Sequence, residues 1–231
     1  MRLLAVDTST DTEGVAVLDG ETVRAAIHTT NPKTHARRLM ATVDATLTLA
    51  GMTLKDFDGF AVTTGPGSFT GLRIGISAVK GFALAMAKPV AGVSTLEALA
   101  RQFPGFSGKI CPLLDARKGQ IYTALYQSRG GNQWRMVKSA CVVDPEAWLD
   151  ELDLPCLFVG DGLHSYRDLI EERFGGEVQF APPCFNILNA CVVGQIGIQE
   201  IGLGNAVEVG RLTPYYIRKS DAEMKLEKAT A

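Results

Sequence analysis

The sequence is poor in residues that could hold a metal ion, and those it has are not spaced for that purpose. None of its five cysteines forms a C-x-x-C pair, which argues against a zinc site. The three histidines are His28, His35 and His164, and no two of them lie four residues apart, so the H-E-x-x-H motif of metallopeptidases is absent. An odd number of scattered cysteines is typical of a reduced, cytosolic protein.

The sequence also lacks a basic excess and a long uncharged apolar run. Its net charge is −2 and its isoelectric point is about 5.9, whereas proteins that bind nucleic acid tightly by themselves usually carry a basic stripe. We therefore expect any contact with RNA to be made through a partner. No segment approaches the ~18 uncharged apolar residues of a membrane span. The first apolar run ends at Asp7, which is too short for a signal peptide, so we expect a soluble, cytoplasmic protein with no membrane contact.

Common nucleotide-binding and nucleophile motifs are missing as well. The sequence has no G-x-x-x-x-G-K-[ST] phosphate loop and no G-x-G-x-x-G that opens a strand–turn–helix unit. It has no G-x-S-x-G nucleophile elbow, and Ser68 has no neighbouring base in the sequence.

The dominant feature that is present is the stretch of residues 63–85, which predicts a turn followed by a helix. The apolar residues 59–62 indicate a buried strand, and Gly65-Pro66-Gly67 ends that strand. Ser68 or Thr70 is placed to cap the helix that follows.

Three glycines inside this predicted helix need an explanation. Glycine in a helix costs ~1 kcal/mol relative to alanine, yet the helix contains Gly71, Gly75 and Gly81. We favour close contact with a second helix as the reason. Two alternatives stay open: tight packing on the chain's own sheet, and an anion site made by free backbone N–H groups at the glycine-rich turn.

The order of the predicted elements indicates an internal duplication. Each half begins with a buried strand that ends at an aspartate, Asp7 or Asp115. Each half continues as a meander of two more strands, at residues 14–18 and 23–28 and at residues 121–126 and 134–137. Because residues 104–108 are rich in Pro, Gly and Ser, we predict two α/β domains, residues 1–104 and 105–231.

The remaining segments predict further helices and strands. Residues 34–50 form a helix ended by Gly51, and Asp144 and Pro145 start another. The other predicted elements are strands at residues 89–93 and 157–159, a helix to residue 103 capped by Ser94 with Glu97, a helix at 166–174, and a long apolar helix from Asn186 towards residue 201. Residues 221–231 are charged or small and are predicted to fray.

Five motifs, taken together, resemble the bacterial TsaB/YeaZ family, and the resemblance covers nearly the whole chain. The motifs are Asp7-Thr8-Ser9-Thr10, GPGSFTGLRIG at residues 65–75, GVSTLEALA at 92–100, DARKGQIY at 115–122 and PYYIR at 214–218. The GPGSFTG run is the most specific of them. The chain departs from the common family pattern at Thr63-Thr64, at Ala36-Arg37-Arg38 and at Gln120, and each departure bears on partner preference.

The resemblance implies an actin-like, sugar-kinase-like fold of two duplicated subdomains, each with a mixed sheet flanked by helices. It also implies a non-catalytic subunit that is required for threonylcarbamoylation of adenosine 37 in tRNA. The partners it implies are a catalytic paralogue of the TsaD type and an ATPase of the TsaE type, with a homodimer when the paralogue is absent and contact with tRNA only indirectly.

The same resemblance assigns two sets of residues. The partner interface lies on the helix after GPG, at Phe69, Gly71, Leu72, Arg73, Gly75, Ala78, Val79 and Phe82. A vestigial nucleotide site would comprise Asp7, Thr8, Ser9, Asp115, Arg117, Gly160 and Gly162, with no cofactor required and only weak ATP or ADP binding. The turn after Asp7 is equally explained as a plain Asx turn, and Asp161 would bring a carboxylate near phosphates, which argues against tight ATP binding.

Three functions therefore stay open at this point. The first is a scaffold that activates a catalytic paralogue, which we favour. The second is an ATP-dependent phosphotransferase that uses Asp7 and Asp115. The third is a peptidase of the M22 type, a label once applied to the family.

Overall fold

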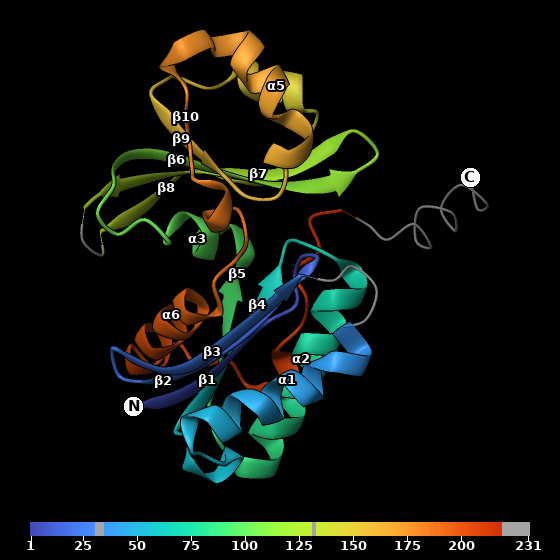
Figure 1. The fold of residues 1–231 in the computed structure, drawn as a ribbon, viewed down its shortest axis with the longest axis vertical. Coiled ribbons are helices and arrows are strands. Elements are labelled where there is room, and N and C mark those ends of the chain that lie inside the picture. Colours follow the sequence, from blue (N-terminus) through green and yellow to red (C-terminus); the bar gives the residue numbers. More distant parts are fainter. Residues whose placement is uncertain (31–34, 131–132, 219–231) are drawn as a thin grey trace, which may run out of the picture.

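Two lobes, each built on a five-stranded sheet, are stacked along the long axis of the molecule (Figure 1). The computed structural model describes residues 1–30, 35–130 and 133–218. The chain completes most of one lobe before it enters the other, and the two lobes meet at the carboxyl ends of the central strands of the first sheet.

The first sheet has the strand order β3-β2-β1-β4-β5. Its strands are β1 (Arg2–Asp7), β2 (Thr12–Asp19), β3 (Thr22–Thr30), β4 (Gly59–Gly65) and β5 (Val90–Ser94). The meander β1–β2–β3 is antiparallel, and β1, β4 and β5 are parallel. The two-residue turn between β2 and β3 is the predicted hairpin, where Gly20 has a positive φ of 60°.

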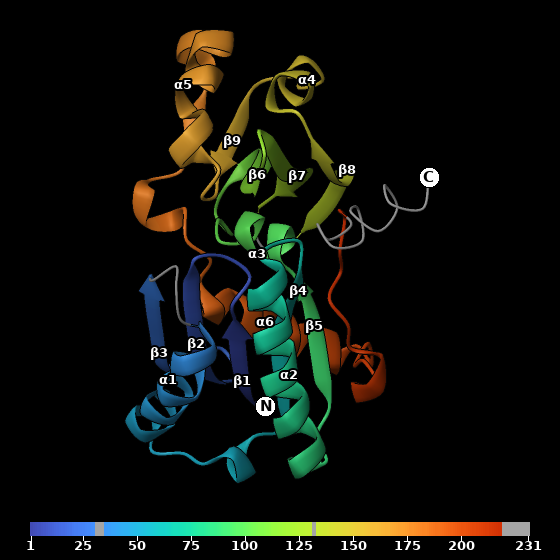
Figure 2. The same cartoon turned by 90° about the vertical axis from the view of Figure 1, so that its right-hand side faces the viewer.

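Helices cover both faces of the first sheet, which is why its central strands are apolar on both sides. Along β1, Leu4 and Val6 face α1 (His35–Ala50) and α2 (Phe69–Met86). The alternate residues Leu3 and Ala5 face α6 (Ala190–Gly202). Figure 2 shows α1 and α2 side by side on one face of the sheet. The short 3₁₀ helix η1 (Leu54–Asp56) joins α1 to β4.

The second sheet repeats the first, in the order β10-β9-β6-β7-β8. Its strands are β6 (Ser107–Arg117), β7 (Gln120–Arg129), β8 (Trp134–Val143), β9 (Cys156–Val159) and β10 (Gln179–Phe180). Each lobe therefore consists of an antiparallel meander extended by two parallel strands on its first-strand side. This confirms the predicted duplication and the predicted fold class.

Helices of the second lobe lie on both faces of its sheet. The face with Cys111, Leu113 and Phe158 packs on α4 (Pro145–Asp150) and α5 (Leu163–Phe174). The other face packs on α3 (Thr95–Ala100), which lies between the two sheets. Further 3₁₀ turns are η2 (Gly175–Glu177), η3 (Pro183–Phe185) and η4 (Val209–Arg211).

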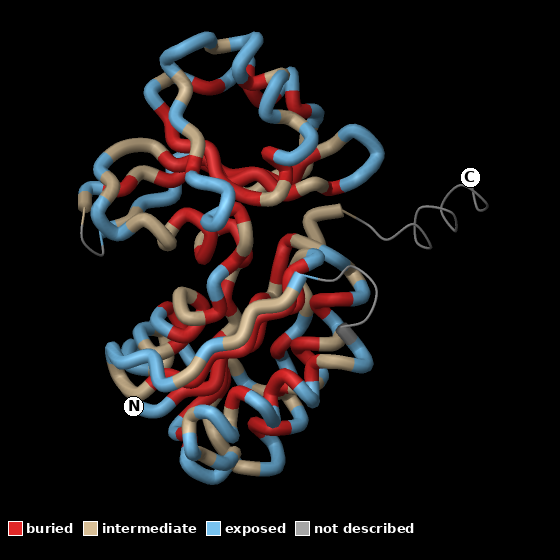
Figure 3. Tube along the Cα trace, in the orientation of Figure 1, coloured by how far each residue is buried: buried red, intermediate tan, exposed pale blue. Residues whose placement is uncertain are grey.

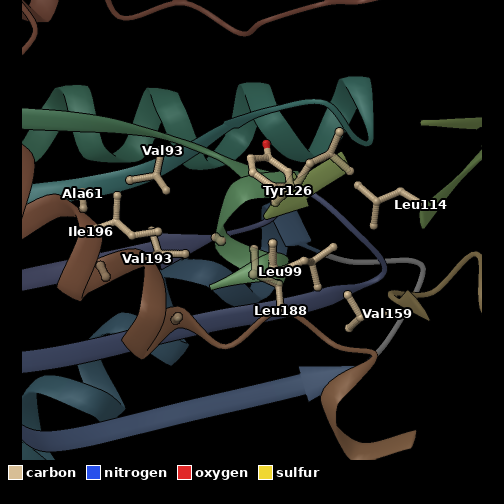
Figure 4. Close-up of a cluster of buried hydrophobic side chains, with 14 of the residues drawn as sticks. Ala61, Val93, Leu99, Leu114, Tyr126, Val159, Leu188, Val193 and Ile196 are labelled. Carbon is tan, nitrogen blue, oxygen red and sulfur yellow. The ribbon is translucent and has the colours of Figure 1, made fainter. Parts of the chain in front are cut away.

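One apolar core runs through the junction of the lobes. Leu99 of α3 and Leu188 lie between residues of the first sheet, such as Val93, and residues of the second, such as Tyr126 and Val159 (Figure 4). Buried positions in Figure 3 continue from one sheet to the other through α3. The lobes are therefore joined by packed side chains as well as by the chain.

The boundary predicted at residue 104 stays a prediction, and the structure adds one fact that bears on it. Helix α6 comes from the range 105–231, but it packs on the first sheet, against β1, β2, β4 and β5. The chain therefore returns to the first lobe after completing the second.

Most predicted helix starts agree with the structure. Ser68 accepts a hydrogen bond from the N–H of Gly71 (3.2 Å) and caps α2, and Ser94 caps α3. Asp144 accepts from two N–H groups at the start of α4. Two expectations were wrong: α3 ends at Ala100 instead of reaching residue 103, and the cap of α6 is Asn189 instead of Asn186.

Asn186 has a different role. Its side-chain oxygen accepts a hydrogen bond from the N–H of Gly160 (3.2 Å), so the side chain holds the loop after β9. Its backbone ends η3, and α6 begins after Asn189.

Helix α2 is the one helix among the described residues that is long and apolar enough to cross a membrane by length and composition alone. Its apolar residues Leu72, Ile76 and Val79 are buried against the first sheet. The helix is therefore explained as a core helix of its own lobe. The predicted fraying of residues 221–231 lies outside the described residues.

Candidate functional site

The loop after β1 packs directly against the start of α2. The hydroxyl of Thr8 donates to the carbonyl oxygen of Gly71 (2.7 Å). A Cβ at Gly71 would lie 2.0 Å from the carbonyl oxygen of Thr8, one at Gly75 would lie 2.4 Å from the Thr8 hydroxyl, and one at Gly67 would lie 2.2 Å from the carbonyl oxygen of Ser9. Any side chain at these positions would overlap with the loop.

This contact corrects the reason that we favoured for two of the helical glycines. Gly71 and Gly75 are buried against the chain's own loop, so no second helix can approach them. Gly81 differs, because it is exposed and a Cβ there would meet nothing within 4 Å. The alternative of packing on the chain's own sheet is right only in part: the loop at Thr8 makes the closest contacts, and the sheet adds Val62, 3.5 Å from a Cβ at Gly75. Of the three glycines, Gly81 stays available for a partner.

The predicted interface residues divide in the same way. Arg73 is exposed, and Phe69 and Ala78 are half-buried. The other five are buried in the chain's own lobe: Gly71, Leu72, Gly75, Val79 and Phe82. Their side chains cannot meet a partner in this structure, because they already fill the core or touch the loop at Thr8.

The PYYIR motif lies on the GPGSFTGLR motif, a contact that was not expected from the sequence. The ring of Tyr216 stacks on that of Phe69, with centroids 4.4 Å apart and planes 14° apart. The Nε of Arg73 donates to the Tyr216 hydroxyl (2.7 Å), and the N–H of Tyr215 donates to the carbonyl oxygen of Thr64 (2.7 Å). Both motifs were used to identify the family resemblance, but their spacing in the sequence does not predict that they are in contact.

The same segment crosses from one lobe to the other. Arg218 donates to the carbonyl oxygen of Ala116 (2.8 Å), near the end of β6. Residues 214–218 therefore connect the start of α2 with the second lobe.

A cleft of about 360 Å³ opens between the lobes beside this segment. Its lining comes from the loops after β1, β4 and β9, from the starts of α2 and α5, from β6 and β7, and from residue 218. The lining residues are Ser9, Thr10, Asp11, Gly67, Ser68, Phe69, Leu114, Asp115, Ala116, Arg117, Tyr122, Asp161, His164, Ser165 and Arg218. Of the seven residues predicted for a vestigial nucleotide site, Ser9, Asp115 and Arg117 line this cleft.

Asp7 and Thr8 do not line the cleft. Asp7 is fully buried, and its Oδ1 accepts from the N–H of Ser9 (3.0 Å), the hydroxyl of Ser9 (2.6 Å) and the hydroxyl of Thr63 (2.7 Å). This is the geometry of an Asx turn tied to the neighbouring strand β4. The carboxylate therefore organises the loop, and the plain structural explanation accounts for it.

Gly160 and Gly162 also serve the fold. Gly160 has a φ of 117°, and a Cβ there would lie 2.2 Å from the carbonyl oxygen of Leu113. The N–H of Gly160 donates to Asn186, and the N–H of Gly162 donates to the carbonyl oxygen of Leu113 (3.1 Å). Neither N–H group is available to a phosphate in this arrangement.

The carboxylates of the cleft make it electronegative near that loop. Burial raises the pKa of Asp161 to about 6, and the negative charges of Asp115 and Asp11 add to this rise. A hydrogen bond from the N–H of Asp115 to Asp161 (3.1 Å) acts in the opposite direction and lowers the pKa. Arg117 offsets part of this charge, since its guanidinium lies 3.3 Å from Asp115 and 3.6 Å from Asp11 of the other lobe. Polyphosphate would therefore meet carboxylates here as well as the arginine.

Among the described residues, no group of three or more His, Cys, Asp or Glu side chains is arranged to hold a metal ion. The five cysteines are free thiols.

A second candidate site is the outward side of α1 and α2, which we call the α1–α2 surface. On α1 it consists of Arg37, Arg38, Met40, Ala41, Asp44, Ala45 and Leu49; on α2 it consists of Arg73, Ile74, Ser77, Lys80, Gly81, Leu84 and Ala85. Met40 is 54% exposed, and Leu49 and Leu84 are each 70% exposed. Small residues between them, such as Ala45 and Gly81, would let another helix approach closely.

The two stacked lobes with a cleft between them define a protein of the actin-like, sugar-kinase-like class. The same fold occurs in the ROK hexokinase of Thermus thermophilus, with a TM-score of 0.51 at 12% identity. The superposition covers 88% of this chain and 100% of the hexokinase. At that identity the likeness shows the fold alone.

Closer relatives identify the family. A family model described as TsaD, tRNA N6-adenosine threonylcarbamoyltransferase, matches residues 27–226. The tRNA threonylcarbamoyladenosine biosynthesis protein TsaB of Bacillus subtilis is 34% identical over 227 residues, with 97% of each chain covered, and TsaB of Escherichia coli is 34% identical over 235 residues, with 98% of each covered. The structure of YeaZ from Pseudomonas aeruginosa has a TM-score of 0.79 at 30% identity, over 93% of this chain and 99% of that one. The chain belongs to the TsaB family, whose members are also named YeaZ.

Proposed function

We propose that the chain takes part in making threonylcarbamoyladenosine at position 37 of tRNA, as the non-catalytic partner of a TsaD-like transferase. In this role it binds the transferase through the α1–α2 surface and so activates it. The observation that carries the proposal is that surface: two adjacent helices of a well-packed lobe expose Met40, Leu49 and Leu84, with small residues between them.

The cleft supports a role without independent catalysis. Asp7, which a phosphotransferase of this fold would direct at magnesium and phosphate, is buried and bonded to Ser9 and Thr63. Asp161 adds a carboxylate beside Asp115. Both features favour the scaffold over the ATP-dependent phosphotransferase.

The proposal includes the other partners expected of the family. A TsaE-like ATPase completes the assembly, the chain pairs with itself when the transferase is absent, and tRNA is held by the partner. The protein works in the cytoplasm and needs no bound cofactor, although a weak affinity for ATP or ADP at the cleft is compatible with its role.

Reconstitution tests this function directly. Purified transferase, tRNA and a threonylcarbamoyl donor are incubated with and without the chain, and modified adenosine is quantified by mass spectrometry. We expect modification to depend on the chain. Equal modification without it would rule out the activating role, and phosphate transfer or peptide cleavage by the chain alone would favour the phosphotransferase or the peptidase.

A matched pair of variants tests the surface. Gly81→Trp places a bulky side chain in the middle of the α1–α2 surface, and Gly202→Trp places one at the exposed end of α6; a Cβ meets nothing within 4 Å at either position. We expect Gly81→Trp to abolish binding of the transferase by calorimetry and Gly202→Trp to leave it intact, with both variants folded. The buried Gly75 is unsuitable for this test, since a bulky residue there would displace Thr8.

A further inference from the structure

The α1–α2 surface has the opposite sign of charge from the molecule as a whole. The net charge of the chain is −2. The two helices nevertheless carry four cationic side chains, Arg37, Arg38, Arg73 and Lys80, against one carboxylate, Asp44. All five are exposed or half-buried. The basic residues are therefore presented to whatever covers the surface.

The fold of the chain does not explain the two arginines on α1. Arg37 and Arg38 lie in the first turn of the helix, where the positive end of the helix dipole disfavours cations. Within the part of the chain that the structure describes, no ion pair holds either guanidinium. Their charges thus oppose the helix dipole, and no ion pair with another described residue offsets that cost.

The charges share their stripes with the apolar residues of the surface. Arg37 begins the i, i+4 row that continues through Ala41 and Ala45 to Leu49. Arg73 begins the row that continues through Ser77 and Gly81 to Ala85. The guanidinium of Arg73 is held in place, because its Nε donates to the Tyr216 hydroxyl (2.7 Å) and its centre lies 5.6 Å from the ring centroid of Tyr216. A partner that covers the apolar stripe must therefore also meet these charges.

We infer that the α1–α2 surface selects a partner protein whose helices present carboxylates, in preference to a second copy of this chain. The inference rests on the proposed function, since it specifies the chemistry of the partner at that surface. In a symmetric pair of identical chains the same patch meets itself, so a net positive surface would face a net positive surface. Like charges across an interface oppose association, and a carboxylate-bearing surface removes that penalty.

The composition of the surface favours a protein over a nucleic acid. Met40, Leu49 and Leu84 are large, apolar and more than half exposed. Helix-on-helix packing buries such side chains, whereas a phosphate backbone would leave them in contact with water or charge.

The test compares two associations of the full chain at low and high ionic strength, about 0.05 M and about 0.5 M. Sedimentation equilibrium measures self-association, and calorimetry measures binding to the purified transferase. At high ionic strength, salt screens the charges, so the complex with the transferase should weaken and the homodimer should tighten. Arg37→Glu should weaken the complex by about five-fold and strengthen the homodimer. Arg135→Glu, an equal charge change on the exposed edge of the second lobe, should change neither.

The outcomes separate this inference from the proposed function. A transferase complex that is insensitive to salt and to Arg37→Glu would overturn the charge selection and leave the proposed function standing. A wild-type chain that never binds the transferase would refute the proposed function, and a homodimer that tightens with salt would still support the charge selection. The inference would be overturned if the chain associated neither with itself nor with the transferase under any condition. It would also be overturned if the isolated chain bound tRNA and Arg37→Glu abolished that binding.

Discussion

Thr8 and Gly71 touch at two points, although they are 63 residues apart in the chain. The Thr8 hydroxyl donates to the Gly71 carbonyl oxygen (2.7 Å), and the Thr8 carbonyl oxygen would lie only 2.0 Å from a Cβ added at residue 71. The loop that follows β1 is thereby fixed against the first turn of α2. The two most distinctive motifs of the first lobe form one packed unit.

Gly71→Ala should destabilise the protein strongly. The new methyl group would overlap with backbone, which cannot swing aside as a flexible side chain can, so we expect a loss of about 3 kcal/mol. For a chain of this size that corresponds to a melting temperature lower by roughly 6–12 °C. Thermal and urea denaturation measure both quantities.

Gly81→Ala is the matched control for that variant. Gly81 lies in the same helix, but a Cβ there meets nothing within 4 Å. We expect this variant to gain about 1 kcal/mol from helix propensity alone. Two variants of equal stability would show that the loop does not constrain α2.

Stability should fall when His28 is protonated. Its Nε2 accepts the N–H of Ala190 at the start of α6 (2.9 Å), which only the neutral ring can do. Burial lowers the pKa of His28 below its ordinary 6.5. The unfolded chain therefore binds the proton more readily, so this contribution is complete above pH 6.5 and is lost as the pH falls through the lowered pKa.

Urea denaturation between about pH 7 and about pH 5 measures this loss. His28→Gln keeps a neutral acceptor and removes the titration, so its unfolding free energy should fall less over that range than that of the wild type. Identical curves for the wild type and His28→Gln would mean that the contact with Ala190 does not depend on protonation.

The parts of the fold that could be predicted from the sequence are those set by local signals. Alternating apolar residues, the hairpin at Asp19-Gly20 and the aspartate cap at Asp144 each act within a few residues. The repeated meander was predictable because both copies carry the same local signals. The return of α6 to the first sheet was not, because an apolar helix can cover either lobe.

The candidate site depends even more than the fold on contacts between distant segments, which the sequence does not show. Gly71 and Gly75 share a face of α2 because they lie four residues apart, and Gly81 lies on another face. The sequence shows this spacing, but only the contact with the distant Thr8 shows that the shared face is closed to a partner. The stacking of Tyr216 on Phe69 likewise joins residues that no periodicity connects. Contacts between distant segments decide which face of α2 serves the core and which is open to a partner.

Asp161→Asn should stabilise the protein at neutral pH. In the folded protein the pKa of Asp161 is about 6, raised chiefly by burial from its ordinary value of 3.8. The folded state therefore holds the proton more tightly, and ionisation above pH 6 costs stability. After allowance for solvent screening at this half-buried position, we expect a gain of about 1 kcal/mol at pH 7 that vanishes near about pH 4. Urea denaturation at the two pH values measures the difference, and a gain that is equal at both would show that ionisation is not its cause.

The stack of Tyr216 on Phe69 should contribute to stability as a coupled pair. Its rings are 4.4 Å apart and nearly parallel, and the Tyr216 hydroxyl also accepts from Arg73. A double-mutant cycle of Phe69→Leu and Tyr216→Leu, measured by urea denaturation, should give a coupling energy of about 1 kcal/mol. The same cycle with Tyr215→Leu is the control, because Tyr215 is exposed and is bound through its backbone N–H. If both cycles gave no coupling, the hydrogen bonds of Tyr215 and Arg218 alone would have to hold residues 214–218 against α2 and the second lobe.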